Sequence, residues 1–367
     1  MKNRITVPRK DFSPWRRRLS EKIAAHPLEI IQWESTRRCD MRCAHCGSPS
    51  ERVGQSRELS TNMIKWLFRD IYETIDMSGF RFLTVTGGEP FLRSDLLEVL
   101  GFVHSSFGWV STVQTNGRYL SKNPSVIPDI LSCGVRGIGL DLDGPEPLHD
   151  SMRGESGHFK ATATLISRLL GSSDDLFVTV TTVVTPENIG SLGKLWPIIR
   201  ELNPHRWRLL PIEKVGRSEA TTVLCGEELE ALIRFVYDRR LETVDERCVQ
   251  TELGCIGWLG TEWEGLVRPY VFSCIAGKTC LGILHDGAFS GCAHIDRAFV
   301  QGNVHIDRIA NVWAERYGVF RDTPTPKLCS GCAEAEFCTV PMHKLGMDRK
   351  MRECVFQRIK IYNNGGE

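Results

Sequence analysis

The stretch STRRCDMRCAHCGSPS, from Ser35 to Ser50, carries three cysteines in the spacing C-x3-C-x2-C, at Cys39, Cys43 and Cys46. A structural zinc site uses four protein ligands in a closed tetrahedron. Three thiolates on one short loop instead match three corners of a [4Fe–4S] cube, and the fourth iron is then left without a protein ligand. The loop therefore predicts an iron–sulfur cluster with one iron open to a second molecule.

The overall composition excludes several kinds of partner. The chain has 367 residues, of which 41% are hydrophobic and 25% are charged, and its formal net charge is +1. This balance gives no electrostatic reason to expect binding to nucleic acid or to a membrane surface. No apolar run is long enough to cross a bilayer, and the N-terminus has no signal-peptide core. We therefore expect a cytoplasmic protein with neither kind of partner.

The chain contains 14 cysteines, and most of them lie in tight clusters. A disulfide framework is typical of small secreted domains, whereas this chain is large and has no export signal. Clustered thiols in a reducing compartment favour metal binding. We therefore expect the cysteines to hold metal.

Strand-like and helix-like segments alternate from about residue 28 to residue 211. Six runs are short, apolar and β-branched: 28–34, 82–86, 109–115, 135–142, 176–184 and 205–211. Amphipathic stretches at 60–75 and 94–107 begin at Ser60 and Ser94, which we predict as N-caps. Strands separated by helices indicate parallel βαβ units, in either a doubly wound sheet or a partial barrel.

Unusual polar motifs follow the first four of these strands. The cysteine loop follows the first strand, TGGEP (86–90) the second, QTNG (114–117) the third and DLDG (141–144) the fourth. In both parallel architectures, ligands bind at the carboxyl ends of the strands. The four motifs are therefore expected to form one site.

The cysteine loop together with TGGEP resembles the radical S-adenosylmethionine (SAM) superfamily. The resemblance implies a partial (β/α)6 TIM-type barrel, in which Cys39, Cys43 and Cys46 hold a [4Fe–4S] cluster whose open iron binds SAM. It implies that cleavage of SAM gives a 5′-deoxyadenosyl radical, which is chemistry of the cofactor. An external electron donor of the flavodoxin or ferredoxin type is implied as a partner.

The same resemblance identifies residues that would contact SAM. Glycine lets the backbone approach a ligand closely, and the carboxylate of Glu89 suits the ammonium group. Arg153 is expected to pair either with the SAM carboxylate or with Asp150. Asn188 is expected either to face the site or to cap a helix, and capping is the preferred role. The expected contacts are His45, Gly87, Gly88, Glu89, Asn116, Asp141 and Arg153.

The C-terminal third is similar to the SPASM extension of this superfamily, which holds two further clusters. The first auxiliary cluster would be bound by Cys274, Cys280 and Cys292, and the second by Cys329, Cys332, Cys338 and Cys354. Three [4Fe–4S] clusters are therefore expected in all. Zinc is the alternative, because C-x2-C with distant partners also describes a zinc ribbon.

Two departures from the SPASM pattern affect the expected chemistry. Met342 stands where an eighth cysteine is expected, so the first auxiliary cluster is predicted to have an open iron or to take Cys248 or Cys255 as its fourth ligand. Sulfatase-maturing relatives carry an Asp directly after the third SPASM cysteine, whereas this chain has Ala293. The catalytic base is thus unknown, and the weak candidates are His294 and Asp296.

These observations predict four regions: a basic, solvated arm (1–27), a radical SAM partial barrel (28–215), a bridging region (216–270) with a helix near 226–242, and a SPASM domain (271–367). The predicted activity is the oxidative crosslinking or desaturation of a ribosomally synthesised precursor peptide. Many peptide-modifying members have an N-terminal winged-helix domain, whereas the first strand here begins near residue 28, so leader binding is expected elsewhere. The alternatives are a dehydrogenase of haem, quinone or aminoglycoside metabolism, and a non-catalytic metal protein.

Overall fold

The computed structural model describes residues 11–48, 50, 57–214, 217–218, 222–243, 248–322, 329–338 and 354–363. The six predicted strands are all present: β1 (Ile30–Glu34), β2 (Phe82–Thr86), β3 (Ser111–Gln114), β4 (Val135–Asp141), β5 (Phe177–Val184) and β6 (Arg206–Pro211). They are parallel, and each strand pairs with the next one in the sequence. This order is that of a singly wound partial barrel, so the predicted barrel is confirmed and the doubly wound sheet is excluded.

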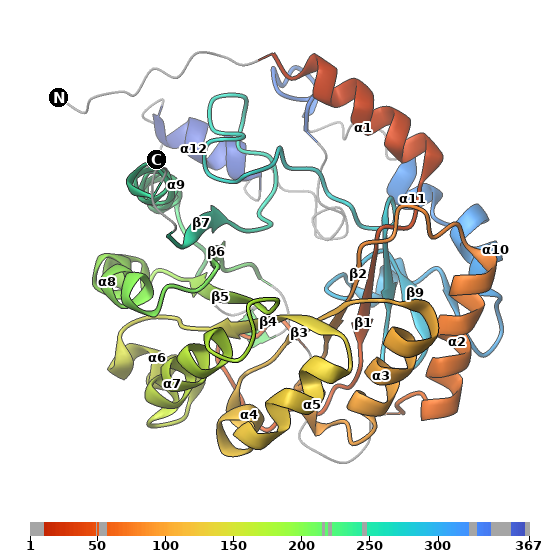
Figure 1. The fold of residues 1–367 in the computed structure, drawn as a ribbon. Helices are drawn as coiled ribbons and strands as arrows, with labels where there is room; N and C mark the ends of the chain where they lie inside the picture. Colours follow the sequence, from red (N-terminus) through yellow and green to blue (C-terminus); the bar gives the residue numbers. More distant parts are fainter. Residues whose placement is uncertain are drawn as a thin grey trace.

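Helices cover the outer face of the curved sheet (Figure 1). They are α2 (Thr61–Thr74), α3 (Leu96–Phe107), α4 (Arg118–Lys122), α5 (Ile127–Ser132), α6 (Glu146–Arg153), α7 (His158–Leu170), α8 (Leu192–Leu202) and α9 (Gly226–Glu242). Large side chains on the outer face of the strands, such as Trp33 and Trp207, are fully buried beneath them. The predicted cap at Ser60 is confirmed, because its side chain accepts a hydrogen bond from the backbone of Met63. The predicted cap at Ser94 is wrong, since α3 begins one residue later, after Asp95.

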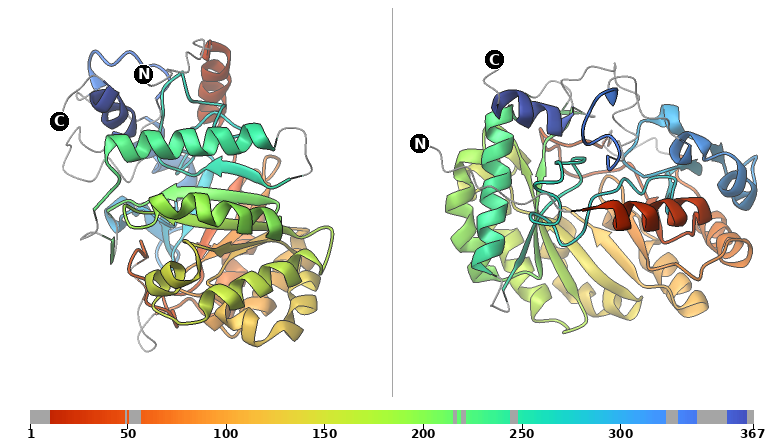
Figure 2. Two further views of the ribbon diagram at one scale, coloured as in Figure 1. Left: turned by 90° about the vertical axis from the view of Figure 1, so that its left-hand side faces the viewer. Right: turned by 90° about the horizontal axis from the view of Figure 1, so that it is seen from above.

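The sheet continues past both edges of the predicted barrel. β7 (Gln250–Leu253) pairs in parallel with β6, and β8 (Cys280–Ile283) pairs in parallel with β1. β9 (Ala288–Ser290) and β10 (Gly302–Asn303) add antiparallel strands beyond β8. Within the described parts of the chain, ten strands therefore share one sheet that crosses the region boundaries expected near residues 215 and 270. Seen from above, the strands form an arc, and the segment after β7 crosses its open side (Figure 2, right).

The expected N-terminal arm contains a helix within its described part, α1 (Ser13–Ala25), and none of the helix residues is fully buried. Trp15 stacks on Trp258 with ring centroids 5.9 Å apart, and Phe12 meets the same ring edge-on at 5.7 Å. These aromatic contacts tie α1 to the segment that follows β7.

The remaining described elements are short. They are the helices α10 (Ile309–Glu315), α11 (Gly318–Arg321) and α12 (Val355–Asn363), and the 3-10 turns η1 (Pro90–Leu92), η2 (Pro124–Val126), η3 (Ile189–Ser191) and η5 (Arg297–Phe299). Among the described residues, no helix has both the length and the apolar character that a membrane span requires.

Candidate active site

The end of β2 packs directly on the cysteine loop. The backbone amides of Gly88 and Glu89 donate to the carbonyls of Thr36 and Arg38, each at 2.7 Å. A Cβ atom at position 87 would lie 2.3 Å from the Thr36 oxygen, and one at position 88 would lie 2.2 Å from the Arg38 oxygen. Only glycine fits at these two positions, and Gly87 also has a φ of +151°. The two glycines therefore let the end of β2 lie against the backbone of the cysteine loop. Their expected close approach to SAM stays a prediction.

The three thiols of this loop lie close enough for their charges to interact. Burial raises the pKa of Cys39 to about 11, and the neighbouring Cys43 raises it further. Burial also raises the pKa of Cys43, whereas the adjacent Arg153 lowers it. The Arg153 guanidinium donates to the Cys43 sulfur at 3.7 Å, and the amide of Asn116 lies 4.0 Å from the Cys39 sulfur.

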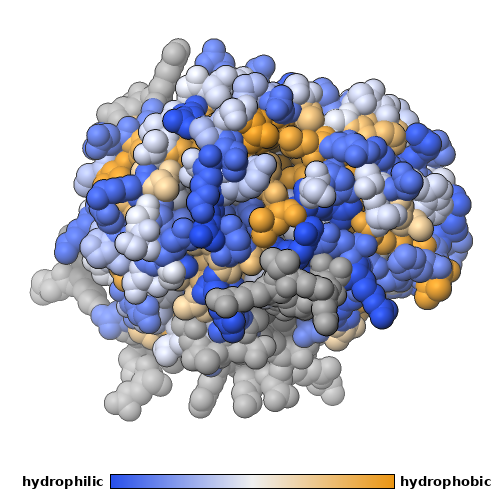
Figure 3. Space-filling view, turned by 90° about the horizontal axis from the view of Figure 1, so that it is seen from below, coloured by the Kyte–Doolittle hydropathy of each residue, from blue (hydrophilic) through white to orange (hydrophobic). Residues whose placement is uncertain are grey.

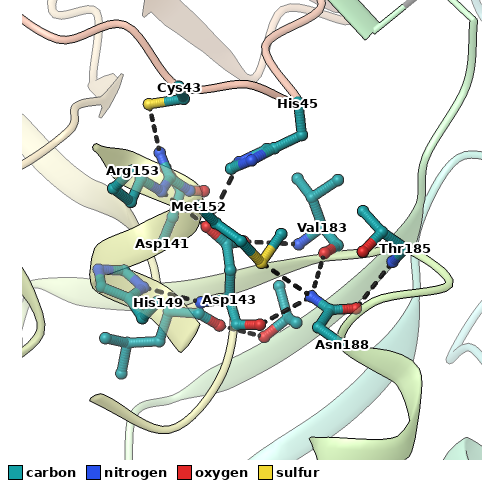
Figure 4. Close-up of polar contacts among 12 residues, drawn as sticks. Cys43, His45, Asp141, Asp143, His149, Met152, Arg153, Val183, Thr185 and Asn188 are labelled. Carbon is teal, nitrogen blue, oxygen red and sulfur yellow. Dashed lines mark hydrogen bonds and ion pairs between the residues drawn. The ribbon is translucent and has the colours of Figure 1, made fainter. Parts of the chain in front are cut away.

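Arg153 is the centre of a buried charge network (Figure 4). Its guanidinium lies 2.6 Å from Asp143 and 3.2 Å from Asp141, and His45 lies 3.3 Å from the same Asp143 carboxylate. Although burial opposes ionisation, Arg153 and His45 hold the pKa of Asp143 well below its usual range. Burial raises the pKa of Asp141, which shares the guanidinium. Asp143 was not among the predicted site residues.

Two alternatives left open by the sequence are settled at this network. Asp150 accepts hydrogen bonds from the backbone amides of Gly157 and Phe159, at 2.6 and 2.8 Å, so pairing of Arg153 with Asp150 is wrong. Arg153 contacts two other carboxylates instead, and its contact with SAM stays a prediction.

The preferred role of Asn188 as a helix cap is also wrong. Its side chain makes no capping hydrogen bond to the turn that it precedes. Instead its amide nitrogen donates to the carbonyls of Asp143 and Val183, each at 2.7 Å, and its oxygen accepts from the backbone of Thr185 (Figure 4). Asn188 therefore joins the ends of β4 and β5 beneath the charge network.

Glu89 is fully buried between the ends of β2 and β3. Its carboxylate accepts hydrogen bonds from the Thr115 hydroxyl and the Asn116 backbone, both at 2.7 Å, and from the Phe91 backbone at 3.2 Å. Burial raises its pKa to about 7. The residue thus fixes the loop that carries Asn116, and its predicted contact with the SAM ammonium group stays a prediction.

Two histidines that the sequence did not single out connect this loop to the charge network. The Nδ1 atom of His149 accepts from the backbone amide of Asp143 at 3.0 Å, and its Nε2 atom lies 2.8 Å from Nδ1 of His158. His158 in turn contacts the carbonyl of Asn116 at 3.0 Å. Burial lowers the pKa of His149 to about 3. Neither histidine belongs to a recognisable motif, so only the tertiary structure could reveal this chain of contacts.

The first auxiliary thiols gather around β8. Continuing the pairing of Gly282 with Ser290 by two residues sets Cys280 opposite Cys292. The thiol of Cys292 donates to the side chain of Gln32 on β1 at 3.0 Å. Burial raises the pKa of Cys292 to about 12, and the charge of Cys274 raises it further.

The second auxiliary thiols are also brought together. Burial raises the pKa of Cys338 to about 12, and Cys354, Cys329 and Cys332 all lie close enough to raise it further. Met342, which stands where an eighth cysteine was expected, lies outside the described residues. Of the two weak base candidates, His294 is exposed, and Asp296 is engaged in capping the turn at Arg297–Phe299.

The donors present suit the groups that the sequence implies. Within the described residues, no three His, Cys, Asp or Glu side chains converge as the ligands of one metal ion would. A [4Fe–4S] cube is compatible with this spacing, because each of its thiolates binds a different iron. The buried Nδ1 atom of His45 has no hydrogen-bond partner in the described structure, which leaves it available to a ligand beside the first loop.

Comparisons with known proteins agree with this geometry. A model described as the radical SAM superfamily matches residues 33–195, and one described as an iron–sulfur cluster-binding domain (SPASM) matches residues 274–333. The AdoMet-dependent heme synthase of Oleidesulfovibrio alaskensis is 27% identical over 88% of this chain and 90% of its own. The mycofactocin maturase MftC of Mycolicibacterium smegmatis is 23% identical over 84% of this chain and 76% of its own.

The fold is also that of a solved structure. Streptococcus suis SuiB bound to S-adenosylmethionine superimposes with a TM-score of 0.68 and 17% identity, over 93% of this chain and 81% of the SuiB chain. The chain is a radical SAM enzyme that carries a SPASM domain, and its cofactors are [4Fe–4S] clusters and S-adenosylmethionine.

Proposed function

We propose that this radical SAM/SPASM enzyme oxidises an organic substrate that binds inside the partial barrel. When bound, the cofactors supply abstraction of one hydrogen atom and an acceptor for one electron. The substrate then gives up either a proton, to leave a product two hydrogens lighter, or carbon dioxide from a carboxylate. In both cases the products balance, because one electron leaves with the hydrogen atom and a second reaches the acceptor.

One observation carries this proposal: strand β1 leads into the first cysteine loop and also contacts Cys292, a proposed ligand of the first auxiliary cluster. The cysteine loop follows the carboxyl end of β1, and Gln32 on the same strand accepts the hydrogen bond from Cys292. A substrate lying beside the inner face of β1 would therefore be near both the radical source and the first auxiliary thiols. This arrangement favours oxidation of the substrate radical over its reduction.

The inner face of the barrel is charged on the side opposite β1. Along β6, Trp207 and Leu209 are buried, so Arg206 and Arg208 point to the other face. Both arginines pair with Glu252 on β7, at 3.6 and 3.0 Å. Two guanidinium groups against one carboxylate leave a net positive charge, which suits a substrate with carboxylate groups.

One face of the molecule also offers apolar surface. Figure 3 shows the end of the molecule at which α4 lies in Figure 1, which is the carboxyl end of β3. Hydrophobic residues border a hollow near the centre of this face (Figure 3). A substrate that combines an apolar body with carboxylates would match both surfaces.

A carboxylated tetrapyrrole is therefore the first substrate class that we propose. The heme synthase from O. alaskensis matches this chain over nearly the whole length of both, and an Fe-coproporphyrin III synthase of Methanosarcina barkeri is 29% identical over 39% of this chain. A precursor peptide is the second class. It is supported by MftC and by AlbA, the subtilosin biosynthesis protein of Bacillus subtilis, which is 29% identical over 77% of this chain.

The substrate class is tested by anaerobic turnover with the reconstituted enzyme, SAM and dithionite. Fe-coproporphyrin III is one substrate, and the other is any short peptide encoded beside the gene. Mass spectrometry should show a product lighter by about 2 Da, or by that amount plus carbon dioxide. Replacement of Arg208 by Gln should raise the KM for the carboxylated substrate, whereas Arg200→Gln on the outer helix α8 should not.

The result separates the alternatives. Conversion of the tetrapyrrole alone supports the first class, and a peptide lighter by about 2 Da supports the second. A peptide of unchanged mass with an inverted residue would contradict oxidation, because inversion requires return of a hydrogen atom to the substrate radical.

A further inference from the structure

The ligand set of the first auxiliary site is incomplete in the sequence pattern. Cys274, Cys280 and Cys292 supply three thiols, whereas a fully protein-bound cube takes four. Apart from Cys225, which caps the start of α9, the unassigned cysteines between the two family matches are Cys248 and Cys255. They flank opposite ends of β7, because Cys248 precedes the strand and Cys255 follows it.

Cys255 lies beside the other three thiols. It is close enough to Cys274 and Cys292 for the charge of each to raise its pKa. Besides burial, the charges of the same two thiols raise the pKa of Cys280. The residue is exposed, yet burial raises the pKa of its thiol to about 12. Both observations hold if the side chain lines an inner surface that surrounding protein encloses. This is where a cluster ligand is expected.

A buried cation faces the same thiol. Arg268 is 0% exposed, and its charge lowers the pKa of Cys255. One of its terminal nitrogens donates to the carbonyl of Gly257 at 3.1 Å. Within the described residues, its Nε and Nη1 atoms have no hydrogen-bond partner. The terminal nitrogen that bonds Gly257 also lies 3.8 Å from the buried Glu264 carboxylate, so Nε and Nη1 are the donors left to meet a second anionic group. A thiolate-ligated cluster is such a group, and it would offset the cost of burying these donors.

We propose that Cys255 is the fourth protein ligand of the first auxiliary [4Fe–4S] cluster. Its thiol proton is released to solvent when iron binds, and ligation itself transfers no electron. The cluster is then closed by protein, and Met342 has no part in it.

This assignment gives the cluster a structural role. Cys255 follows β7, at one edge of the sheet, whereas Cys280 lies in β8, on the far side of β1. The segment between them crosses the open side of the arc (Figure 2, right). A cluster bound by both cysteines therefore fastens the two sides of the partial barrel to each other.

The ligand is tested in a background that lacks Cys39, Cys43 and Cys46, so that only the auxiliary clusters contribute to the spectra. We expect Cys255→Ala either to remove about four of about eight irons per chain or to alter the EPR spectrum of the reduced cluster. Cys248→Ala and Cys225→Ala should leave both measurements unchanged. A Cys255→Ala protein with the iron content and spectrum of its parent would overturn the proposal, as would an effect of Cys248→Ala alone.

A second measurement avoids dependence on a variant that folds poorly. The reconstituted natural-sequence protein is treated with iodoacetamide before and after mild removal of iron by a chelator. Alkylation of Cys255 should accelerate at least tenfold after iron removal, whereas Cys133, a partly buried thiol outside the clusters, should keep its rate and so report that the fold is intact. An unchanged rate at Cys255 would contradict the assignment.

Discussion

At the scale of single residues, the site is organised by buried charges that neutralise one another. Arg153 joins Asp141, Asp143 and the Cys43 sulfur, so one guanidinium links the cysteine loop to the end of β4. A buried carboxylate without this partner would carry a large desolvation cost. The position of the first cysteine loop therefore depends on residues more than 100 positions away in the sequence.

Glu89 provides a test at this scale. Replacement by Ala should weaken SAM binding by about 1–3 kcal/mol, because a buried charged hydrogen-bond acceptor is lost. Isothermal titration of the anaerobic holoprotein measures this change, with Glu98→Ala on the outer helix α3 as the control. Equal SAM affinity in the two variants would remove Glu89 from the binding site.

His149 makes a pH-dependent prediction. Its folded pKa is lowered from 6.5 to about 3, so below pH 6.5 the unfolded chain binds a proton that the folded protein excludes. Stability is therefore fully present above pH 6.5 and falls as the pH drops towards 3, by up to about 1.4 kcal/mol per pH unit from this group. Urea unfolding of the iron-free protein should show a shallower acid dependence for His149→Gln than for the exposed control His305→Gln. Identical slopes would show that His149 does not contribute.

At the scale of elements, aromatic rings connect the start of helix α1 to the segment that carries Cys338. Phe337, next to Cys338, packs against Phe12 on the approach to α1 and against Trp258, each at 6.1 Å. These rings form one aromatic cluster with Trp15. The helix is amphipathic only weakly, so its position depends on these few aromatic rings.

Replacing Trp15 by Ala should destabilise this arrangement. Loss of the stacking contact with Trp258 is expected to cost about 0.5–1.5 kcal/mol and to speed hydrogen exchange along α1. Arg17→Ala, at an exposed position of the same helix, is the matched control. Equal exchange rates in the two variants would indicate that Trp15 does not anchor the helix.

The sequence predicted the elements that have strong local patterns. The six barrel strands carry continuous apolar runs. The glycines of TGGEP belong to a recognisable motif, in which only glycine allows the close backbone contact. β7 and β8 were not predicted, because they lie outside the region of alternating strands and helices and are defined by the strands with which they pair. Asp143 and Asn188 could not be assigned correctly either, since their roles depend on contacts between β4 and β5 that local sequence does not encode.

At the scale of the whole molecule, one continuous sheet carries both kinds of cluster site. β1 leads into the cysteine loop and pairs with β8, which contributes Cys280. The radical SAM and SPASM regions are therefore not independent bodies linked by a tether, and strand pairing sets the distance from the cysteine loop after β1 to Cys280 on β8. Such rigidity is suited to electron transfer, in which distance controls the rate.

The most direct test of the central claim is release of 5′-deoxyadenosine from SAM by the dithionite-reduced, reconstituted protein. The natural sequence and Cys225→Ala should both release it and should hold about twelve irons per chain, corresponding to three clusters. Cys43→Ala should release none while keeping about eight irons, because the first loop can no longer assemble its open cluster. Undiminished release by Cys43→Ala, or no release by the natural sequence with all its clusters present, would contradict the account.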